Sequence, residues 1–294
     1  MLAVLAAAEA RSAHPMIDVS FFRDPRFTAA ATAVALALFT LLGFIFLMTQ
    51  YFQFVRGYGP LSTGVRLLPV ALSVGAGSVA GTQLAVRAGT KLIVTIGLVA
   101  MAVFYVWVAA TTSATTSYGV IAAQMVLYGL GLGLTSAPAT ESIMGAISRA
   151  KAGVGSAVND STRLIGGTLG VAVIGSVYLS VYGTRLTATT PAHIPGPIVS
   201  LAHQSVGAAY AAAGQIAALG HPALGQALQH AATNAFLPGL TVGSLVAGGV
   251  AAAGALLAVL FLPAQPASLP AGRVDQAEEA HDTEAQADPA SAVQ

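Results

Sequence analysis

The sequence predicts an all-α, polytopic membrane protein with six transmembrane helices, and its composition and charge distribution are the first reasons. Of its 294 residues, 55% are hydrophobic and only 8% are charged, whereas about 25% of the residues in a typical soluble domain are charged. Between Pro25 and Val274 the only acidic residues are Glu141 and Asp160. A soluble protein of this size needs far more charge on its surface. These observations exclude a soluble enzyme, and the net charge of +1 gives no reason to expect a nucleic-acid partner.

Six apolar stretches are long enough to cross a bilayer as helices, which takes about 20 residues each. They cover residues 27–50, 64–86, 92–110, 118–140, 154–182 and 238–262. Abundant Ala and Leu favour helix, and membrane β-strands would be shorter, at about 10 residues, with alternating hydrophobicity. We expect an N-terminal stub and interfacial segment over residues 1–26, a six-helix transmembrane domain over 27–262 with an external link over 183–237, and a disordered acidic cytoplasmic tail over 263–294.

The basic residues predict the orientation, because cytoplasmic loops of membrane proteins are enriched in Lys and Arg. With the N-terminus inside, only Arg56, Arg66 and Arg185 fall outside. The basic residues that fall inside are Arg11, Arg23, Arg26, Arg87, Lys91, Arg149, Lys151 and Arg273. Together with the low lysine content and the richness in Ala and Gly, this predicts a multi-pass protein of a bacterial cytoplasmic membrane with both termini cytoplasmic. Within the external link, residues 201–219 could form a helix on the membrane surface, and the histidines there show no metal-ligand spacing.

Three charged residues within or at the ends of the spans are candidates for function. Glu141 lies at the cytoplasmic end of the fourth span, and Asp160 and Arg163 lie near the start of the fifth. A charged group at a helix centre costs about 2.5 to 3.5 kcal/mol on insertion scales, so such groups usually have a role. Asp160 and Arg163 share a helix face, and we expect them to neutralise one another, with Glu141 as a second partner. The group is either a proton-linked site or a structural gate, and we favour the gate.

Two polar groups are candidates for substrate contact. Phe46, Gln50 and Gln53 are spaced to share one helix face, and Gln124 and Tyr128 form an i, i+4 pair in the fourth span. A buried amide in a bilayer requires either a water-filled cavity or a hydrogen bond to another helix, and the sequence leaves both alternatives open.

Three G-x-x-x-G pairs are expected to allow close helix packing. They are Gly77 with Gly81, Gly129 with Gly133, and Gly166 with Gly170. We expect a purely structural role for these glycines, because chance matches are common in a chain rich in Ala and Gly.

Several separate motifs, in a fixed order, point to one family. They are the segments His14–Arg23, Leu47–Tyr58, Gly64–Pro69, Ala137–Thr140 and Ala152–Asp160. Together they closely resemble the C-terminal half of 14-helix drug:proton antiporters of the major facilitator superfamily, in its multidrug efflux branch. The resemblance covers about residues 8–262, including the long link before the last helix.

The resemblance implies a secondary active transporter that exports drugs or other lipophilic or cationic compounds by proton antiport, without a cofactor and without enzymatic activity. Its partners would be the lipid bilayer, a small lipophilic substrate, protons and an N-terminal transporter half whose motifs are absent from this sequence. Because similar transporters bind substrate between two halves, we expect this chain to be incomplete alone, as a truncated gene product, an internal start or one member of a split pair. The alternative is a membrane assembly module that pairs with a separate N-terminal half, or a nonfunctional remnant.

The resemblance also implies roles for individual residues. In similar transporters the helix segment around Asp160 and Arg163 meets an acidic loop of the N-terminal half and closes the cytoplasmic side. Arg87, Gly89 and Lys91 match a degenerate cytoplasmic loop motif. Val86 stands where related sequences often place an acid, so this loop lacks the acidic partner of a gating ion pair.

Overall fold

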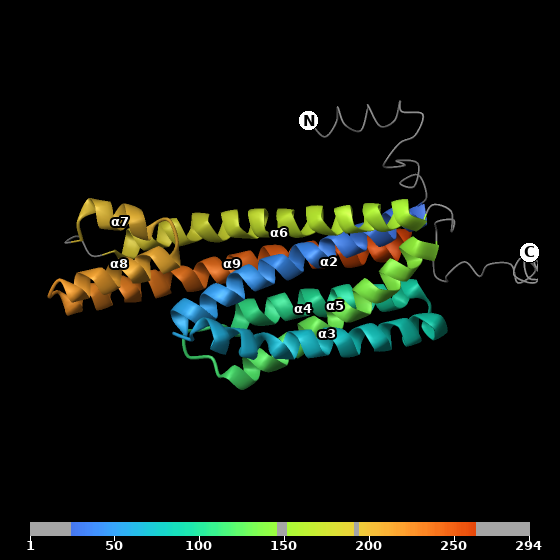
Figure 1. Cartoon of the computed structure of the whole chain (residues 1–294), viewed down its shortest axis with the longest axis horizontal. Helices are drawn as coiled ribbons and strands as arrows, with labels where there is room; N and C mark the ends of the chain where they lie inside the picture. Colours follow the sequence, from blue (N-terminus) through green and yellow to red (C-terminus); the bar gives the residue numbers. More distant parts are fainter. Residues whose placement is uncertain (1–24, 146–151, 191–193, 263–294) are drawn as a thin grey trace, which may run out of the picture.

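The computed structural model describes residues 25–145, 152–190 and 194–262, which form long helices joined by short turns (Figure 1). The helices are α2 (Pro25–Gln50), which continues into the π-helix η2 (Tyr51–Val55), α3 (Pro60–Ala88), α4 (Thr90–Thr111), α5 (Tyr118–Gly145), α6 (Ala152–Thr189), α7 (Gly196–Ala202), α8 (Val206–Ala218) and α9 (Pro222–Phe261). Six of these helical segments are long and apolar enough to cross a membrane. The predicted all-α fold class is therefore confirmed.

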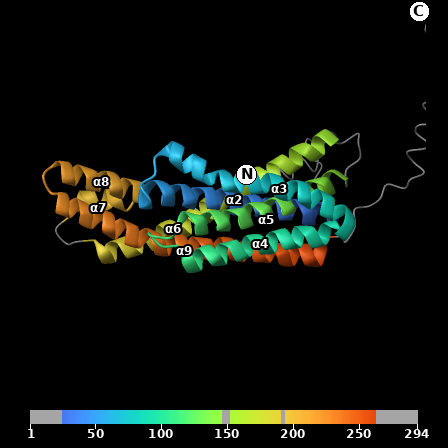
Figure 2. The same cartoon turned by 90° about the horizontal axis from the view of Figure 1, so that it is seen from below.

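The transmembrane helices pack as a layer of four and a pair. Within the layer α3 packs on α5, α5 on α2, and α2 on α6, and we call these four helices the front layer. Helices α4 and α9 pack on one another and form the back pair. Contacts of α4 with α5, and of α9 with α2 and α6, join the two sets. Figure 2 shows α4 and α9 side by side along one edge of the molecule, with α3 at the opposite edge.

Glycines bring the helices of the front layer close together. A Cβ atom on Gly77 of α3 would lie 2.7 Å from the carbonyl oxygen of Leu130 in α5, and one on Gly133 would lie 2.5 Å from the carbonyl oxygen of Val74. Gly166 and Gly170 of α6 approach the backbone of α2 in the same way. The expected structural role of the G-x-x-x-G pairs is therefore confirmed, since backbones this close leave no room for a side chain.

An aromatic cluster fills the centre of the bundle. The Tyr128 ring of α5 stacks on Phe44 of α2 at 5.0 Å and lies 4.7 Å from the Phe104 ring of α4. The Tyr105 hydroxyl donates a hydrogen bond to the Thr40 carbonyl oxygen at 2.6 Å. These contacts connect the front layer to the back pair. The hydrogen bond satisfies a phenol that would be costly to bury alone in a bilayer.

The segment of the predicted external link, residues 183–237, is largely helical where the structure describes it. Helix α6 extends to Thr189 and α9 begins at Pro222, so these helices have 38 and 40 residues. At 1.5 Å per residue they are about 57 and 60 Å long, which exceeds the roughly 40–45 Å of a whole bilayer. We call the projecting ends of α6 and α9, together with α7 and α8, the cap (Figure 1).

The helices of the cap pack on one another. Helix α8, which falls within the segment 201–219 that could form a helix on the membrane surface, packs on α9 and on α7. The Tyr210 hydroxyl lies 2.6 Å from Thr233 Oγ1 of α9, and the Tyr182 hydroxyl of α6 donates to the Ala202 carbonyl oxygen at 3.1 Å. The cap therefore continues the fold of the bundle beyond its transmembrane part.

Candidate functional site

A partly open cavity of about 420 Å³ lies among the four helices of the front layer. The residues that line it are Leu38 and Leu41 of α2, Val74 and Ser78 of α3, Leu132, Ser136, Ala137 and Thr140 of α5, and Arg163 of α6. This volume is at the lower end of the range of small-molecule sites, about 300 to 1,000 Å³. An apolar wall with a few polar groups is also typical of such sites.

Arg163 is the charged residue of the cavity. Its side chain is half-buried, and its Nε atom is buried without a hydrogen-bond partner. The hydroxyl residues Ser136 and Thr140 are one turn apart on α5. Sequence reasoning selected Arg163 as a charge within a span but missed the hydroxyl residues as lining groups. Their i, i+4 spacing in an apolar helix was the available signal.

The three predicted charged residues do not form the expected network. Asp160 is exposed, and it makes no ion pair with Arg163 within 4 Å in the described part of the chain. Glu141 accepts a hydrogen bond from the Thr82 hydroxyl of α3 at 3.2 Å. The expected neutralisation of Asp160 by Arg163 is therefore wrong for this structure. Its reason is that the long arginine side chain extends into the cavity while the short carboxylate stays on the exposed side of α6.

Gln124 and Tyr128, two of the predicted substrate contacts, lie inside the bundle. Both side chains are at most 1% exposed. The Gln124 amide donates to the Thr111 hydroxyl of α4 at 2.9 Å, and the Tyr128 hydroxyl lies 3.3 Å from the Thr40 hydroxyl of α2. For these two residues the structure selects the interhelical alternative, and neither lines the cavity.

Phe46, Gln50 and Gln53 also lie away from the cavity. The Phe46 ring packs edge-on against Tyr178 of α6 at 6.0 Å, and the Gln50 amide donates within its own helix to the Phe46 carbonyl oxygen at 3.3 Å. Gln53 lies in the π-helix η2, whose wider turn breaks the 3.6-residue period that placed it on the same face. The five predicted contacts therefore do not converge on one site.

The predicted cytoplasmic loop motif forms a very tight turn. Helix α3 ends at Ala88 and α4 begins at Thr90, so Gly89 alone connects them, with φ +87° and ψ 144°. This backbone region is essentially restricted to glycine. Arg87 is exposed and Lys91 is half-buried, and neither makes an ion pair with an acid in the described ranges. Arg87 and Lys91 lie at the end of the bundle where α2 begins, which is the end predicted to be cytoplasmic.

At the opposite end of the bundle, arginines stabilise the turn between α2 and α3. The Arg56 guanidinium donates to the carbonyl oxygens of Ala114 and Thr116 at 2.8 and 3.2 Å. The Arg66 guanidinium lies 3.9 Å from the centre of the Tyr58 ring. The hydrogen bond from Arg56 and the nearby positive charges lower the pKa of the Tyr58 phenol. These arginines are thus engaged in structural contacts, unlike Arg163.

The basic residues in the described ranges do not decide the orientation. Arg26, Arg87 and Lys91 lie at the end where α2 begins, and Arg56, Arg66 and Arg185 lie at the other end. The further basic residues of the predicted bias, Arg11, Arg23, Arg149, Lys151 and Arg273, lie outside the described residues. The orientation therefore stays a prediction.

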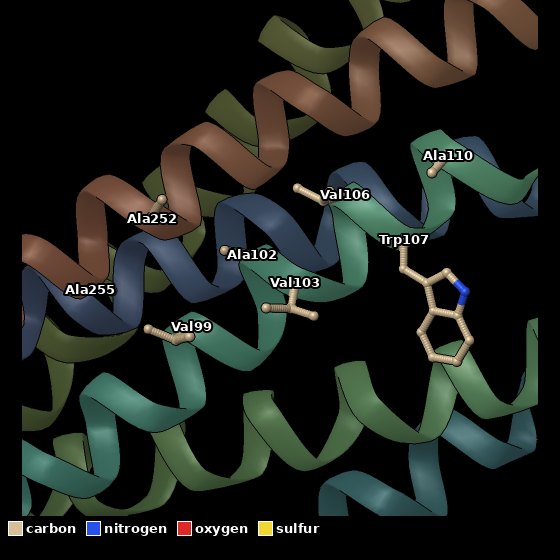
Figure 3. Close-up of a pocket in the computed structure, with 8 residues that line it drawn as sticks. All are labelled: Val99, Ala102, Val103, Val106, Trp107, Ala110, Ala252 and Ala255. Carbon is tan, nitrogen blue, oxygen red and sulfur yellow. The ribbon is translucent and has the colours of Figure 1, made fainter.

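A second hollow, on the back pair, has a different character. It is lined by Val99, Ala102, Val103, Val106, Trp107 and Ala110 of α4 and by Ala252 and Ala255 of α9 (Figure 3). The Trp107 indole N–H is the single polar side-chain group among these residues. Nothing else there could orient a polar ligand, and large parts of Val99, Val103 and Val106 are exposed. This surface has the composition expected for contact with lipid tails, and the cavity of the front layer is the better candidate site.

Six membrane-length helices with an amphipathic cavity in one layer define a multi-pass membrane protein. Residues 5–171, more than half of the sequence, match the Major Facilitator Superfamily. The chain belongs to this superfamily.

Several curated relatives carry names that concern drug resistance or export. The multidrug efflux pump LfrA of Mycolicibacterium smegmatis is 31% identical over 252 residues, which cover 85% of this chain and 49% of the relative. The tetracenomycin C resistance and export protein of Streptomyces glaucescens is 28% identical over 267 residues, covering 88% and 48%. The methyl viologen resistance protein SmvA of Salmonella typhimurium is 28% identical over 238 residues, covering 81% and 46%. The chain thus spans about half the length of these relatives.

Proposed function

We propose that this chain forms one half of a secondary active transporter that exports drugs or other lipophilic compounds by proton antiport. The observation that carries the proposal is the cavity of the front layer, which combines apolar walls with hydroxyl groups and Arg163. An arginine in contact with lipid tails is costly. A second six-helix unit packed over the front layer would enclose the cavity and cover Arg163, as in transporters that bind substrate between two repeats.

Ile45 supports docking of another unit on the front layer. It is 41% exposed and lies four residues after Leu41 and seven after Leu38, so it extends the cavity-lining face of α2. On α3, Ala71, Gly75 and Ser78 share the flank beside the cavity, and such small residues allow another helix to approach closely. An apolar face around a cavity that carries a few polar groups suits a partner that closes over a substrate.

The charged residues beside the cavity complete the proposal. Glu141 and Asp160 are the carboxylates within the described spans, and we propose that a proton exchanged by this half passes through one of them. Glu141 directly follows Thr140, which lines the cavity, and Asp160 lies one turn before Arg163. We propose that this end of the front layer contributes to a cytoplasmic gate, with both termini cytoplasmic and the cap outside a bacterial cytoplasmic membrane.

The proposal is tested by efflux of Nile red, an uncharged lipophilic dye, from bacteria that lack their own multidrug pumps. We expect no efflux from cells that express the chain alone. Co-expression with the N-terminal six-helix half of LfrA should give efflux that a protonophore abolishes. Co-purification of the two halves without efflux would assign the chain an assembly role instead.

A pair of substitutions tests whether the front layer is the docking face. Ile45→Trp should prevent co-purification of the second half, because it places a bulky ring on the face of α2 that continues the cavity. Val103→Trp adds the same ring to the surface of the back pair and should leave co-purification unchanged. Efflux from cells that express the chain alone would contradict the proposal of one half if two copies do not pair through the front layer. Pairing of two copies is detected as a cross-link through Ile45→Cys.

A further inference from the structure

We propose that the cavity of the front layer recognises an oxyanion, and that the exported compounds are amphiphiles with an acidic group. Arg163 would bind the acidic group, and the apolar walls of α2, α3 and α5 would hold the body of the molecule. This inference rests on the proposed function, and it names the substrate class of the same cavity.

The unpaired state of Arg163 is the first argument. Its Nε is buried without a partner, and the described residues give no hydrogen bond or ion pair to its other nitrogens. A guanidinium stays charged and offers five N–H donors in a fork that matches carboxylate and sulfonate oxygens. The half-buried Arg163 side chain lines the cavity with this nitrogen unpaired, so a ligand that supplies an anion gains a charge-assisted hydrogen bond that the protein leaves open.

The acids near the cavity do not provide the missing partner. Glu141 does not line the cavity, and its carboxylate accepts a hydrogen bond from Thr82 on α3. Asp160 is exposed on α6. The described lining residues thus carry one positive charge and no negative charge. A cationic ligand would meet repulsion from this guanidinium.

The cavity also lacks the other common means of binding a cation. Lipophilic cations are recognised by the faces of Trp, Tyr or Phe rings, and none of the described lining residues is aromatic. The polar groups beside Arg163 are instead the hydroxyls of Ser78, Ser136 and Thr140, each of which can donate a hydrogen bond to an oxyanion. Leu38, Leu41 and Val74 provide a compact apolar wall for the rest of the ligand.

A matched pair of fluorescent probes tests the proposal by binding, without any need for transport. The probe 1-anilinonaphthalene-8-sulfonate and the uncharged N-phenyl-1-naphthylamine share one aromatic body and differ by the sulfonate. Both are titrated into the full chain in lipid nanodiscs, with empty nanodiscs as background. We expect the wild-type chain to bind the sulfonate at least tenfold more tightly after background subtraction, as a charge-assisted hydrogen bond would give.

Variants of Arg163 assign that preference to the guanidinium. Arg163→Gln should weaken binding of the sulfonate about tenfold or more and change binding of the uncharged probe less than about twofold. Arg163→Lys should retain part of the preference, since it keeps the charge but loses the fork. Arg185→Gln, on the exposed outer part of the same helix, is the matched control and should behave like the wild type. Binding of the uncharged probe and an unchanged thermal unfolding curve confirm that each variant is folded.

Three results would overturn the proposal. Two are equal binding of the two probes by the wild type and equal losses of both probes in Arg163→Gln. The other comes from the chain co-expressed with a second half: if the preference for the sulfonate disappears there, a carboxylate of that half occupies Arg163. If the preference remains, the anion is a free ligand. Because the titrations measure binding to the chain alone, a failure of transport in the efflux assay leaves their outcome unaffected.

Discussion

Replacing Gly77 by alanine tests the close packing of α3 on α5. The added Cβ would lie 2.7 Å from the Leu130 carbonyl oxygen and 3.0 Å from its Cα atom. Both neighbours are backbone atoms, so no side-chain rotation can relieve the contact and the helices must move apart. Overpacking of this kind costs about 1–3 kcal/mol. Alanine is also the better helix former by about 1 kcal/mol, and this gain partly hides the cost.

Gly75 is the control position for the gain in helix propensity. It lies in the same helix, two residues earlier, and a Cβ there would meet nothing within 4 Å. Gly75→Ala therefore has the helix-propensity gain without the clash. The difference in the free energy of unfolding between the two variants should equal the packing cost, so we expect Gly77→Ala to be less stable than Gly75→Ala by about 1–3 kcal/mol.

The measurement is reversible unfolding in mixed micelles with an increasing fraction of sodium dodecyl sulfate, followed by the loss of helical circular dichroism. Equal free energies of unfolding for the two variants would refute the reasoning. Such a result would mean that α3 and α5 can separate by several tenths of an ångström without losing packing energy.

Two further predictions concern the tight turn and the orientation. Gly89→Ala places a side chain at φ +87° and should lower the free energy of unfolding by about 1–3 kcal/mol in the same assay. Gly59→Ala, at φ −64° with nothing within 4 Å of the added Cβ, should have little effect, and equal losses would argue against backbone strain. The chain has no cysteine, so single cysteines report sidedness: a membrane-impermeant maleimide added to intact cells should label Thr115→Cys and spare Arg87→Cys. The reverse pattern would invert the proposed orientation.

The fold class follows from the sequence because a bilayer imposes a length and a composition on every span. The predicted sixth span began at residue 238, whereas α9 begins at Pro222. The missed segment contains Gln229, His230 and Asn234, which interrupt an apolar run. Its buried residues, including Leu228, Ala232 and Phe236, recur with helical spacing. An amphipathic helix that packs in the cap carries this period, and a search for continuous apolar runs does not detect it.

The candidate site could be predicted only in part. Arg163 is recognisable because a charge in an apolar helix is rare, and the structure places it at the cavity. The sequence does not reveal which side of each helix faces the bundle interior. Gln124 and Tyr128 therefore resembled cavity residues, although both have partners on neighbouring helices. Similarly, no local pattern in the sequence predicts the π-helical turn that displaces Gln53.

The length of α6 and α9 gives the cap a mechanical property. If the inner end of the 40-residue α9 lies at the inner membrane surface, the tip of the cap is about 40 Å from the bilayer midplane. The edge of the hydrocarbon core is about 15 Å from that plane. In a rigid rotation about an axis at the midplane, displacement grows with distance from the axis, so the tip would travel more than twice as far as any lipid-embedded residue. The cap would then act as a lever arm, and a pair of spectroscopic labels placed on it would report small angular movements of the helices beneath.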